Sequence, residues 1–200
     1  NKIQTEGSVE ITTGENTITF EYTKRTDLEY IVNYLEEGTN AVLASVKTVD
    51  GQTYLSEVTE NAIDIDGYDK VAPTETKITI DVENNVINFY YTKRTDLSYT
   101  VNYFEQGTEN KLVDSKVVDG QTYLAEVTEN AIDVEGYVKQ EPTEQKVTIN
   151  VENNVINFYY IKRNDLIYTV NYLEKDTNAV LAENKVVTNQ KYLDEITENA

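Results

Sequence analysis

The sequence repeats with a period of 69 residues, and this period constrains the fold more than any single motif. The phrases YIVNYLE, YTVNYFE and YTVNYLE begin at residues 30, 99 and 168, and the two complete copies are identical at roughly two thirds of their positions. A tandem unit usually supplies length, valency or an assembly surface, whereas a catalytic site is normally built once. The period predicts four segments: the last part of a repeat in 1–29, complete repeats in 30–98 and 99–167, and the first part of a repeat in 168–200.

Each repeat is small for an independent domain, because about 70 residues bury only about 60% of the surface of the unfolded chain. The sequence has no cysteine and no histidine, so disulfides are excluded and a structural zinc site is disfavoured. Stability must come from strand packing, from contact between neighbouring repeats, or from an unusual covalent bond.

The formal charge is −19, from 36 acidic and 17 basic residues. A chain of this charge is repelled by phosphate backbones and anionic lipids, so we expect no nucleic-acid partner. The sequence has no apolar run of the 18 or so residues that cross a bilayer, so we expect no membrane insertion in this segment. Its first ten residues lack the pattern of a secretory signal.

Two alternating segments close each repeat. Residues 77–82 and 86–92 alternate apolar and polar side chains, and the intervening asparagines favour a tight turn, so the sequence predicts a hairpin. Ile87, Phe89 and Tyr91 are predicted to face the core, because Ile18, Phe20 and Tyr22 occupy the aligned positions.

Tyr90 and Tyr159 are predicted to be exposed, because Glu21 occupies their aligned position. Exposed tyrosines could stack on sugar rings or on a partner protein, although scattered exposed aromatic residues are also normal.

The first half of each repeat predicts another hairpin and one helix. Residues 30–34 and 42–49 form the predicted strands, and Asp50 with Gly51 predicts a turn after them. Residues 56–63 place apolar side chains at helical spacing. The predicted fold class is therefore α+β, mostly β: tandem β-grasp-like (ubiquitin-like) modules with one short helix each, in an elongated array.

Three phrases resemble the MucBP type of repeat found in surface proteins of Gram-positive bacteria: YTVNYLE at the first strand, GY at Gly67 and Tyr68, and VINFYYTK at the last strand. The resemblance implies a β-grasp-like fold, a parent protein attached to the cell wall, and a role as stalk or adhesin, with mucin binding in some members. The expected partner is therefore a glycan or a host surface protein. The resemblance implies no catalytic residue. Mucins are themselves acidic, so a module of this charge would meet like charge unless a divalent cation intervened.

The residues offer little catalytic or metal-binding chemistry. Without histidine or cysteine the common hydrolytic triads are excluded, which leaves a carboxylate-based glycan hydrolase as a remote alternative. We expect no cofactor, with calcium as the alternative. The acidic residues that could bind it occur at four places: Asp50 beside Gly51, Asp64 with Asp66, Asp119 beside Gly120, and Asp133 with Glu135.

A spontaneous isopeptide bond is a further hypothesis for a small unit without cysteine. The candidate lysines are Lys47, Lys116 and Lys185, and the candidate asparagines are Asn33, Asn102 and Asn171. Lysines lying over an apolar edge would give the same pattern without any cross-link.

The end segments carry complementary parts of one repeat. The chain could be a window on a longer array, the folding unit could be phased differently, or the tail of one chain could be completed by the head of the next. Terminal-strand complementation would use Ile18, Phe20 and Tyr22 from one copy and Tyr168, Val170 and Tyr172 from another.

The sequence therefore predicts a non-enzymatic, extracellular repeat module at a bacterial cell surface, acting as a spacer, stalk or adhesin. The alternative is a self-assembling extracellular fibre subunit whose copies join head to tail.

Overall fold

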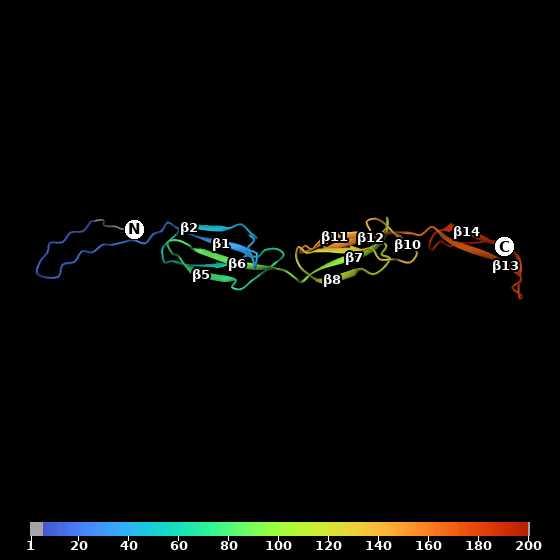
Figure 1. Cartoon of the computed structure of the whole chain (residues 1–200), viewed down its shortest axis with the longest axis horizontal. Coiled ribbons are helices and arrows are strands. Elements are labelled where there is room, and N and C mark those ends of the chain that lie inside the picture. Colours follow the sequence, from blue (N-terminus) through green and yellow to red (C-terminus); the bar gives the residue numbers. More distant parts are fainter. Residues whose placement is uncertain (1–5, 200) are drawn as a thin grey trace. The chain divides into compact units, whose positions relative to one another are not determined.

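The computed structural model describes residues 6–199 and divides the chain into two compact units, Asn1–Arg94 and Thr95–Ala200. Figure 1 shows the strands of each unit along the sequence. Each unit contains one full set of repeat strands, from Leu28 to Lys93 and from Leu97 to Lys162, and each unit is described by itself.

The larger sheet of the first unit has four strands in the order β2-β1-β6-β4. These strands are β1 (Leu28–Glu36), β2 (Lys47–Gln52), β4 (Tyr68–Lys70) and β6 (Val86–Lys93). β1 and β6, the first and last strands of the repeat, pair in parallel from Ile31↔Val86 to Glu36↔Tyr91, whereas β2 and β4 pair antiparallel at the two edges. The sheet is therefore closed by contacts between residues about 55 positions apart.

A second, two-stranded sheet consists of β3 (Glu57–Asn61) and β5 (Glu75–Thr79), which pair antiparallel. Ile80 and Ala62, next to these strands, belong to the same buried cluster as the inner face of the larger sheet. The repeat is thus an all-β unit with one apolar core.

The second unit repeats this arrangement. Its four-stranded sheet has the order β10-β12-β7-β8, again with a parallel central pair, and β9 pairs with β11. The strands are β7 (Leu97–Glu105), β8 (Lys116–Gln121), β9 (Glu126–Asn130), β10 (Tyr137–Lys139), β11 (Glu144–Thr148) and β12 (Val155–Lys162). A two-stranded antiparallel sheet follows, made of β13 (Leu166–Leu173) and β14 (Val180–Gln190).

The predicted core faces of the central strands are confirmed. Ile87, Phe89 and Tyr91 are at most 1% exposed, and Tyr30, Val32 and Tyr34 on β1 are also buried. The ring of Tyr34 stacks on Phe89 with 6.3 Å between centroids. Alternation on β1 and β6 therefore identified the buried side chains correctly, because both strands have one face toward the core.

The predicted helix in residues 56–63 is wrong, and with it the α+β class and the β-grasp-like module. No helix occurs anywhere in the described residues 6–199, and this segment forms β3. Leu55, which the helix would have used, has a φ of 62° and is half exposed, while Val58 alternates with exposed neighbours on the strand. Every residue of β3 pairs with β5, from Glu57↔Thr79 to Asn61↔Glu75. This tertiary pairing overrides the weak helical spacing of the apolar side chains.

The predicted hairpin between residues 77–82 and 86–92 is also wrong. β5 pairs with β3, whereas β6 crosses to the other sheet and pairs with β1 and β4. The predicted turn at Asp50 and Gly51 lies inside β2, where these two residues oppose Glu29 alone and Gly51 has a φ of 71°. This is a β-bulge, and it explains why aspartate and glycine occur in mid-strand.

Across the part of the chain that the structure describes, no helix is long and apolar enough to span a membrane.

Candidate functional site

A cluster of tyrosine, glutamate and lysine joins the two sheets of each complete repeat. In the first repeat Glu60 extends from β3, and its Oε1 accepts hydrogen bonds from the Tyr30 hydroxyl at 2.5 Å and from Lys47 Nζ at 2.6 Å. Tyr30 lies on β1 and Lys47 begins β2, so one carboxylate links three strands. The Glu60 side chain is 12% exposed, whereas that of Lys47 is 46% exposed.

This environment changes the titration of the cluster. Burial raises the pKa of the Glu60 carboxyl, but the hydrogen bonds from Lys47 and Tyr30 together outweigh it and leave the pKa below its ordinary value. The same hydrogen bond to Glu60, with burial, raises the pKa of the Tyr30 hydroxyl. The cluster thus contains a stably ionised carboxylate that accepts hydrogen bonds from two donors. Its pKa shifts do not resemble those of a general acid and base pair.

The cluster recurs at the 69-residue spacing. Glu129 accepts from Tyr99 and from Lys116, each at 2.5 Å, and Glu198 accepts from Tyr168 and Lys185. Sequence reasoning missed these glutamates, although the joint recurrence of one tyrosine, one lysine and one glutamate in three copies was a usable signal.

The lysines named for an isopeptide bond thus contact glutamate. Their candidate partners are engaged elsewhere: Asn33 Nδ2 donates to Asn88 Oδ1 at 2.8 Å, and Asn102 Nδ2 donates to Asn157 Oδ1 at 2.9 Å. The isopeptide bond stays a prediction that these contacts do not support.

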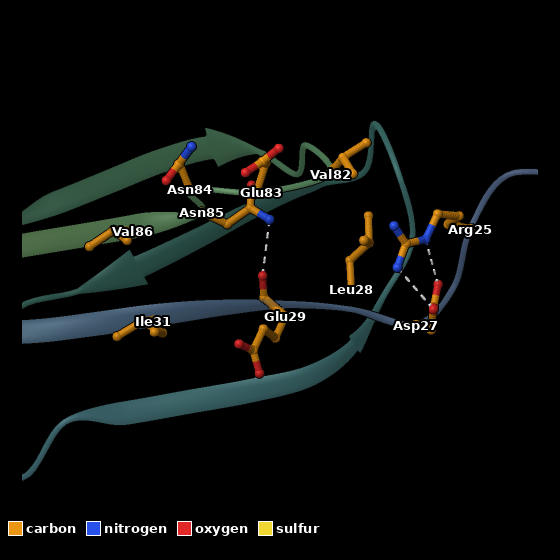
Figure 2. A pocket seen from close by; sticks show the side chains of 10 residues that line it. All are labelled: Arg25, Asp27, Leu28, Glu29, Ile31, Val82, Glu83, Asn84, Asn85 and Val86. Atoms are coloured by element: carbon orange, nitrogen blue, oxygen red, sulfur yellow. Dashed lines mark hydrogen bonds and ion pairs between the residues drawn. The ribbon is translucent and has the colours of Figure 1, made fainter.

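A hollow of about 440 Å³ lies beside the loop that joins β5 and β6, and Figure 2 shows the side chains that line it. Arg25 forms a paired contact with Asp27, with Nε to Oδ1 at 2.9 Å and Nη2 to Oδ2 at 3.0 Å. This contact lowers the pKa of the Asp27 carboxyl and raises the pKa of the Arg25 guanidinium, so both groups stay charged and balance each other. The hollow therefore offers no free charge from this pair to a ligand.

Asn85 organises the loop itself. Its Oδ1 accepts from Asp81 N at 2.7 Å, and its Nδ2 donates to Asp81 O at 2.8 Å and to Glu29 O at 3.0 Å. The bond to Glu29 O, drawn in Figure 2, ties the loop to β1. Asn154 makes the corresponding three bonds in the second repeat.

The two tyrosines predicted to be exposed differ. Tyr159 is 43% exposed and stacks on Phe104 at 6.2 Å, with Lys111 Nζ 6.0 Å from the centre of the Phe104 ring. A hollow of about 420 Å³ is lined by Phe104, Tyr159, Thr108 and Glu109. Two adjacent aromatic rings with polar neighbours form a surface on which a sugar ring or another planar group could stack.

In the first repeat the corresponding surface is weaker. Tyr90 is half-buried, and Leu35 occupies the position aligned with Phe104. The prediction that both tyrosines are exposed is confirmed for Tyr159 only. The change from leucine to phenylalanine at this position is the sequence signal that distinguishes the aromatic surface of the second repeat from that of the first.

The acidic pairs proposed for calcium are not brought into a larger group. Asp64 and Asp133 each form an ion pair at 2.8 Å, with Lys70 and Lys139 respectively. Within residues 6–199 no three acidic side chains are grouped so as to hold a metal ion. Calcium binding stays a prediction.

The start of the next repeat packs directly on the second repeat. Tyr192 N donates to Arg163 O at 2.9 Å, and the Tyr192 ring meets the edge of Tyr137 at 5.7 Å. A Cβ atom placed on Gly136 would lie 2.3 Å from the Tyr192 ring, so only glycine permits this approach. In the first unit Tyr54 N makes the equivalent bond to Arg25 O at 2.9 Å.

The residues named for terminal-strand complementation are exposed or half-buried. Ile18, Phe20 and Tyr22 are 45%, 40% and 67% exposed, and no strand of the described chain begins before Leu28. Tyr168, Val170 and Tyr172 lie on one face of β13 and are half-buried. The structure does not bring the two sets together.

Comparison with known proteins gives little beyond this geometry. No family model and no curated protein matches the sequence. A crystal structure of Mub-RV is similar to 67% of this chain and 98% of its own, at 14% identity and a TM-score of 0.23. A similarity this low supports no functional argument.

Proposed function

We propose that this chain is a non-enzymatic tandem-repeat module of a bacterial cell-surface protein of the MucBP type, acting as a spacer or stalk outside the cell. The observation that carries the proposal is the direct joint between consecutive repeats in the second unit. A ring packed on glycine, a backbone hydrogen bond and the short link from Lys162 to Leu166 leave little freedom there. A joint with little freedom favours an extended arrangement of consecutive repeats and disfavours folding of the chain back on itself.

The polar residues of the repeats support a structural role. Among the described residues, no buried side-chain polar atom lacks a hydrogen-bond partner. Every carboxyl group whose pKa clearly departs from its ordinary value has a lowered pKa. These groups are Asp27, Glu60, Glu129, Asp165 and Glu198. A glycoside hydrolase instead needs one carboxyl with a raised pKa to act as general acid.

The spacer proposal is tested by NMR relaxation of the whole chain. The amides of β13 and those of β12 should show the same rotational correlation time, and inserting eight glycine and serine residues after Asn164 should make β13 tumble faster. The control is the same insertion after Gly107, a turn residue with open space around it, which should leave β13 coupled. Independent motion of β13 in the unmodified chain would contradict the proposal.

A second candidate function, adhesion, is favoured by the aromatic surface of Phe104 and Tyr159. An exposed stacked pair beside polar side chains suits weak binding of a glycan or of a surface protein of the host. Tyr159→Ala should abolish binding on a glycan array and Tyr90→Ala should not. Equal loss from both variants, or binding unaffected by either, would show that this surface is not the site.

A further inference from the structure

The four-stranded sheet of the second repeat carries apolar side chains on the face that points away from the core. They alternate along their strands with more buried residues, and all except the half-buried phenylalanine are at least 43% exposed. These residues, which we call the outer apolar face, are Phe104 on β7, Val117 on β8, Val138 on β10, and Val155, Tyr159 and Ile161 on β12. Cross-strand pairing sets several of them side by side, because Val138 is opposite Ile161 and Tyr159 is opposite Phe104.

The first repeat lacks this face, although roughly two thirds of the positions are identical in the two repeats. The aligned residues are Thr48 for Val117, Asp69 for Val138, Thr92 for Ile161 and Leu35 for Phe104. The polar pair Asp69↔Thr92 is thus replaced as a whole by an apolar pair. The buried residues of the two cores are identical at every aligned position, so the fold does not require the apolar residues on the outer side.

The outer apolar face is broader than the pair of aromatic rings that it contains. It reaches from β10 at one edge of the sheet to β8 at the other. Its valines and isoleucine offer no hydrogen bond to the hydroxyl groups of a sugar. The nearby amides already bond to each other, since Asn102 Nδ2 donates to Asn157 Oδ1 at 2.9 Å. Neighbouring exposed apolar side chains of this kind are typical of a protein interaction surface.

The border of the outer apolar face is acidic. Glu109 lines the hollow that also contains Phe104 and Tyr159. Glu141 follows Gln140, whose N donates to Tyr159 O at 2.9 Å. Both glutamates are exposed. The aligned residues of the first repeat are uncharged, namely Asn40 and Ala72. The second repeat therefore differs from the first by apolar residues on the face and by acidic residues at its border.

This charge pattern indicates a partner with basic groups. The whole chain has a formal charge of −19, which attracts a basic surface and repels a second copy of the chain. Lys111 is an exception at the border, and its Nζ donates to Ser115 Oγ at 2.7 Å. A matching surface therefore has apolar side chains at its centre and lysine or arginine around them.

We propose that the outer apolar face of the second repeat binds a protein surface that is apolar at its centre and basic around it. The proposal rests on the adhesive role proposed above and names the kind of partner. Contact between the apolar centres supplies most of the affinity, and the acidic border orients the partner and speeds association. The first repeat does not bind this partner, so each chain holds one partner molecule at this face.

Fluorescence anisotropy with a synthetic peptide tests the chemistry of the partner. The probe is a short helix of leucine and lysine with its leucines on one side, and the control peptides replace lysine by glutamate or scramble the order. The whole chain should bind one lysine peptide, and less tightly at high salt, because salt screens the charges at the border. Equal binding of the glutamate peptide or of the scrambled peptide would overturn the proposal.

Exchange of residues between the repeats tests where the peptide binds. Val117→Thr, Val138→Asp and Ile161→Thr together introduce the residues of the first repeat and should weaken binding by at least about tenfold. Because this exchange adds a negative charge, attraction by charge alone would strengthen binding instead. Ile132→Thr is the matched control, since Ile132 is 42% exposed and follows β9, outside the four-stranded sheet. It should leave the affinity unchanged.

The reverse exchange gives a result that misfolding cannot produce. Thr48→Val, Asp69→Val and Thr92→Ile together should add a second binding site for the peptide. A chain with no second site, or undiminished binding after the first exchange, would overturn the proposal. Binding of a glycan through Tyr159 without binding of the peptide would refute this partner and leave the adhesive role standing. A dimer of the chain that the first exchange separates, without peptide binding, would assign the face to a second copy and also refute the proposal.

Discussion

Glu60 and Glu129 each hold one tyrosine and one lysine from other strands, and removing both charges should destabilise both complete repeats together. We consider Glu60→Gln combined with Glu129→Gln, which preserves size but replaces a carboxylate by an amide. A hydrogen bond to a charged group contributes about 1.5–3 kcal/mol, whereas a pair with a solvent-exposed lysine contributes about 0–1 kcal/mol. The lysines are 46% and 48% exposed, so the tyrosine bonds dominate.

Because the amide oxygen of glutamine can still accept both bonds but carries no full negative charge, we expect a loss of about 1–2 kcal/mol per repeat in the free energy of unfolding. That loss corresponds to a fall in melting temperature of about 4–8 °C per kcal/mol for a unit of this size. The assay is urea and thermal unfolding followed by circular dichroism at pH 7. Changing both repeats equally keeps their transitions together.

The matched control is Glu57→Gln combined with Glu126→Gln. These glutamates lie on the same strands, β3 and β9, but are exposed, and Glu57 pairs with Lys77, whose side chain is 56% exposed. The charge change is identical, and we expect less than about 0.5 kcal/mol per repeat. Equal destabilisation by the two double variants would show that net charge, and not the cluster, is responsible.

The pH dependence gives an independent check. The pKa of Glu60 is lowered in the folded state, so its contribution is complete above the unfolded value and is lost as pH falls through the folded pKa. The pKa of Tyr30 is raised, so its contribution is present below its unfolded value and is lost as pH rises through the folded pKa. The gap in stability between native and variant chains should therefore be widest from about pH 5 to 10 and should narrow as the pH falls below the ordinary glutamate pKa of about 4.5. A gap that does not narrow on acidification would refute the reasoning.

Three further results are expected. Gly136→Ala should release the hairpin that carries Tyr192, seen as faster hydrogen exchange in β13 and β14, while Gly120→Ala, with a similar positive φ of 70° but open space around it, should not. Asn154→Ala should lower the free energy of unfolding by about 2–3 kcal/mol in urea, because a buried side chain loses three hydrogen bonds; a loss below 0.5 kcal/mol would contradict this. Burial raises the pKa of Tyr160 to about 12, so the absorbance difference between native and Tyr160→Phe chains should emerge only near that pH, and an ordinary titration near pH 10 would contradict it.

The sequence predicted the core strands well because their alternation is a local property. Val32, Phe89 and Tyr91 are buried as expected, and the three aligned copies distinguished the inner face from the outer one. Where the aligned copies differed, as at Glu21, they also predicted correctly that Tyr159 is exposed.

The errors arose where pairing is non-local. Residues 77–82 and 86–92 look like a hairpin, yet β6 pairs with β1, about 55 residues away, and local pattern gives no information on such a partner. Residues 56–63 have apolar spacing compatible with a helix, and only the presence of β5 makes them a strand. The copy of this segment at 195–199 is not a strand in the described chain, which shows how far its conformation depends on its partner.

The parallel pairing of β1 with β6 also determines how a repeat responds to tension. The chain enters the repeat at the start of β1, Leu28, and leaves at the end of β6, Lys93, and in a parallel pair these points lie at opposite ends of the shared ladder. A force that pulls the two ends of the repeat apart therefore slides the strands along each other and loads all the hydrogen bonds from Ile31↔Val86 to Glu36↔Tyr91 at once. An antiparallel hairpin pulled at its open end would instead break its bonds one after another, so this topology makes the repeat mechanically resistant along its own chain direction.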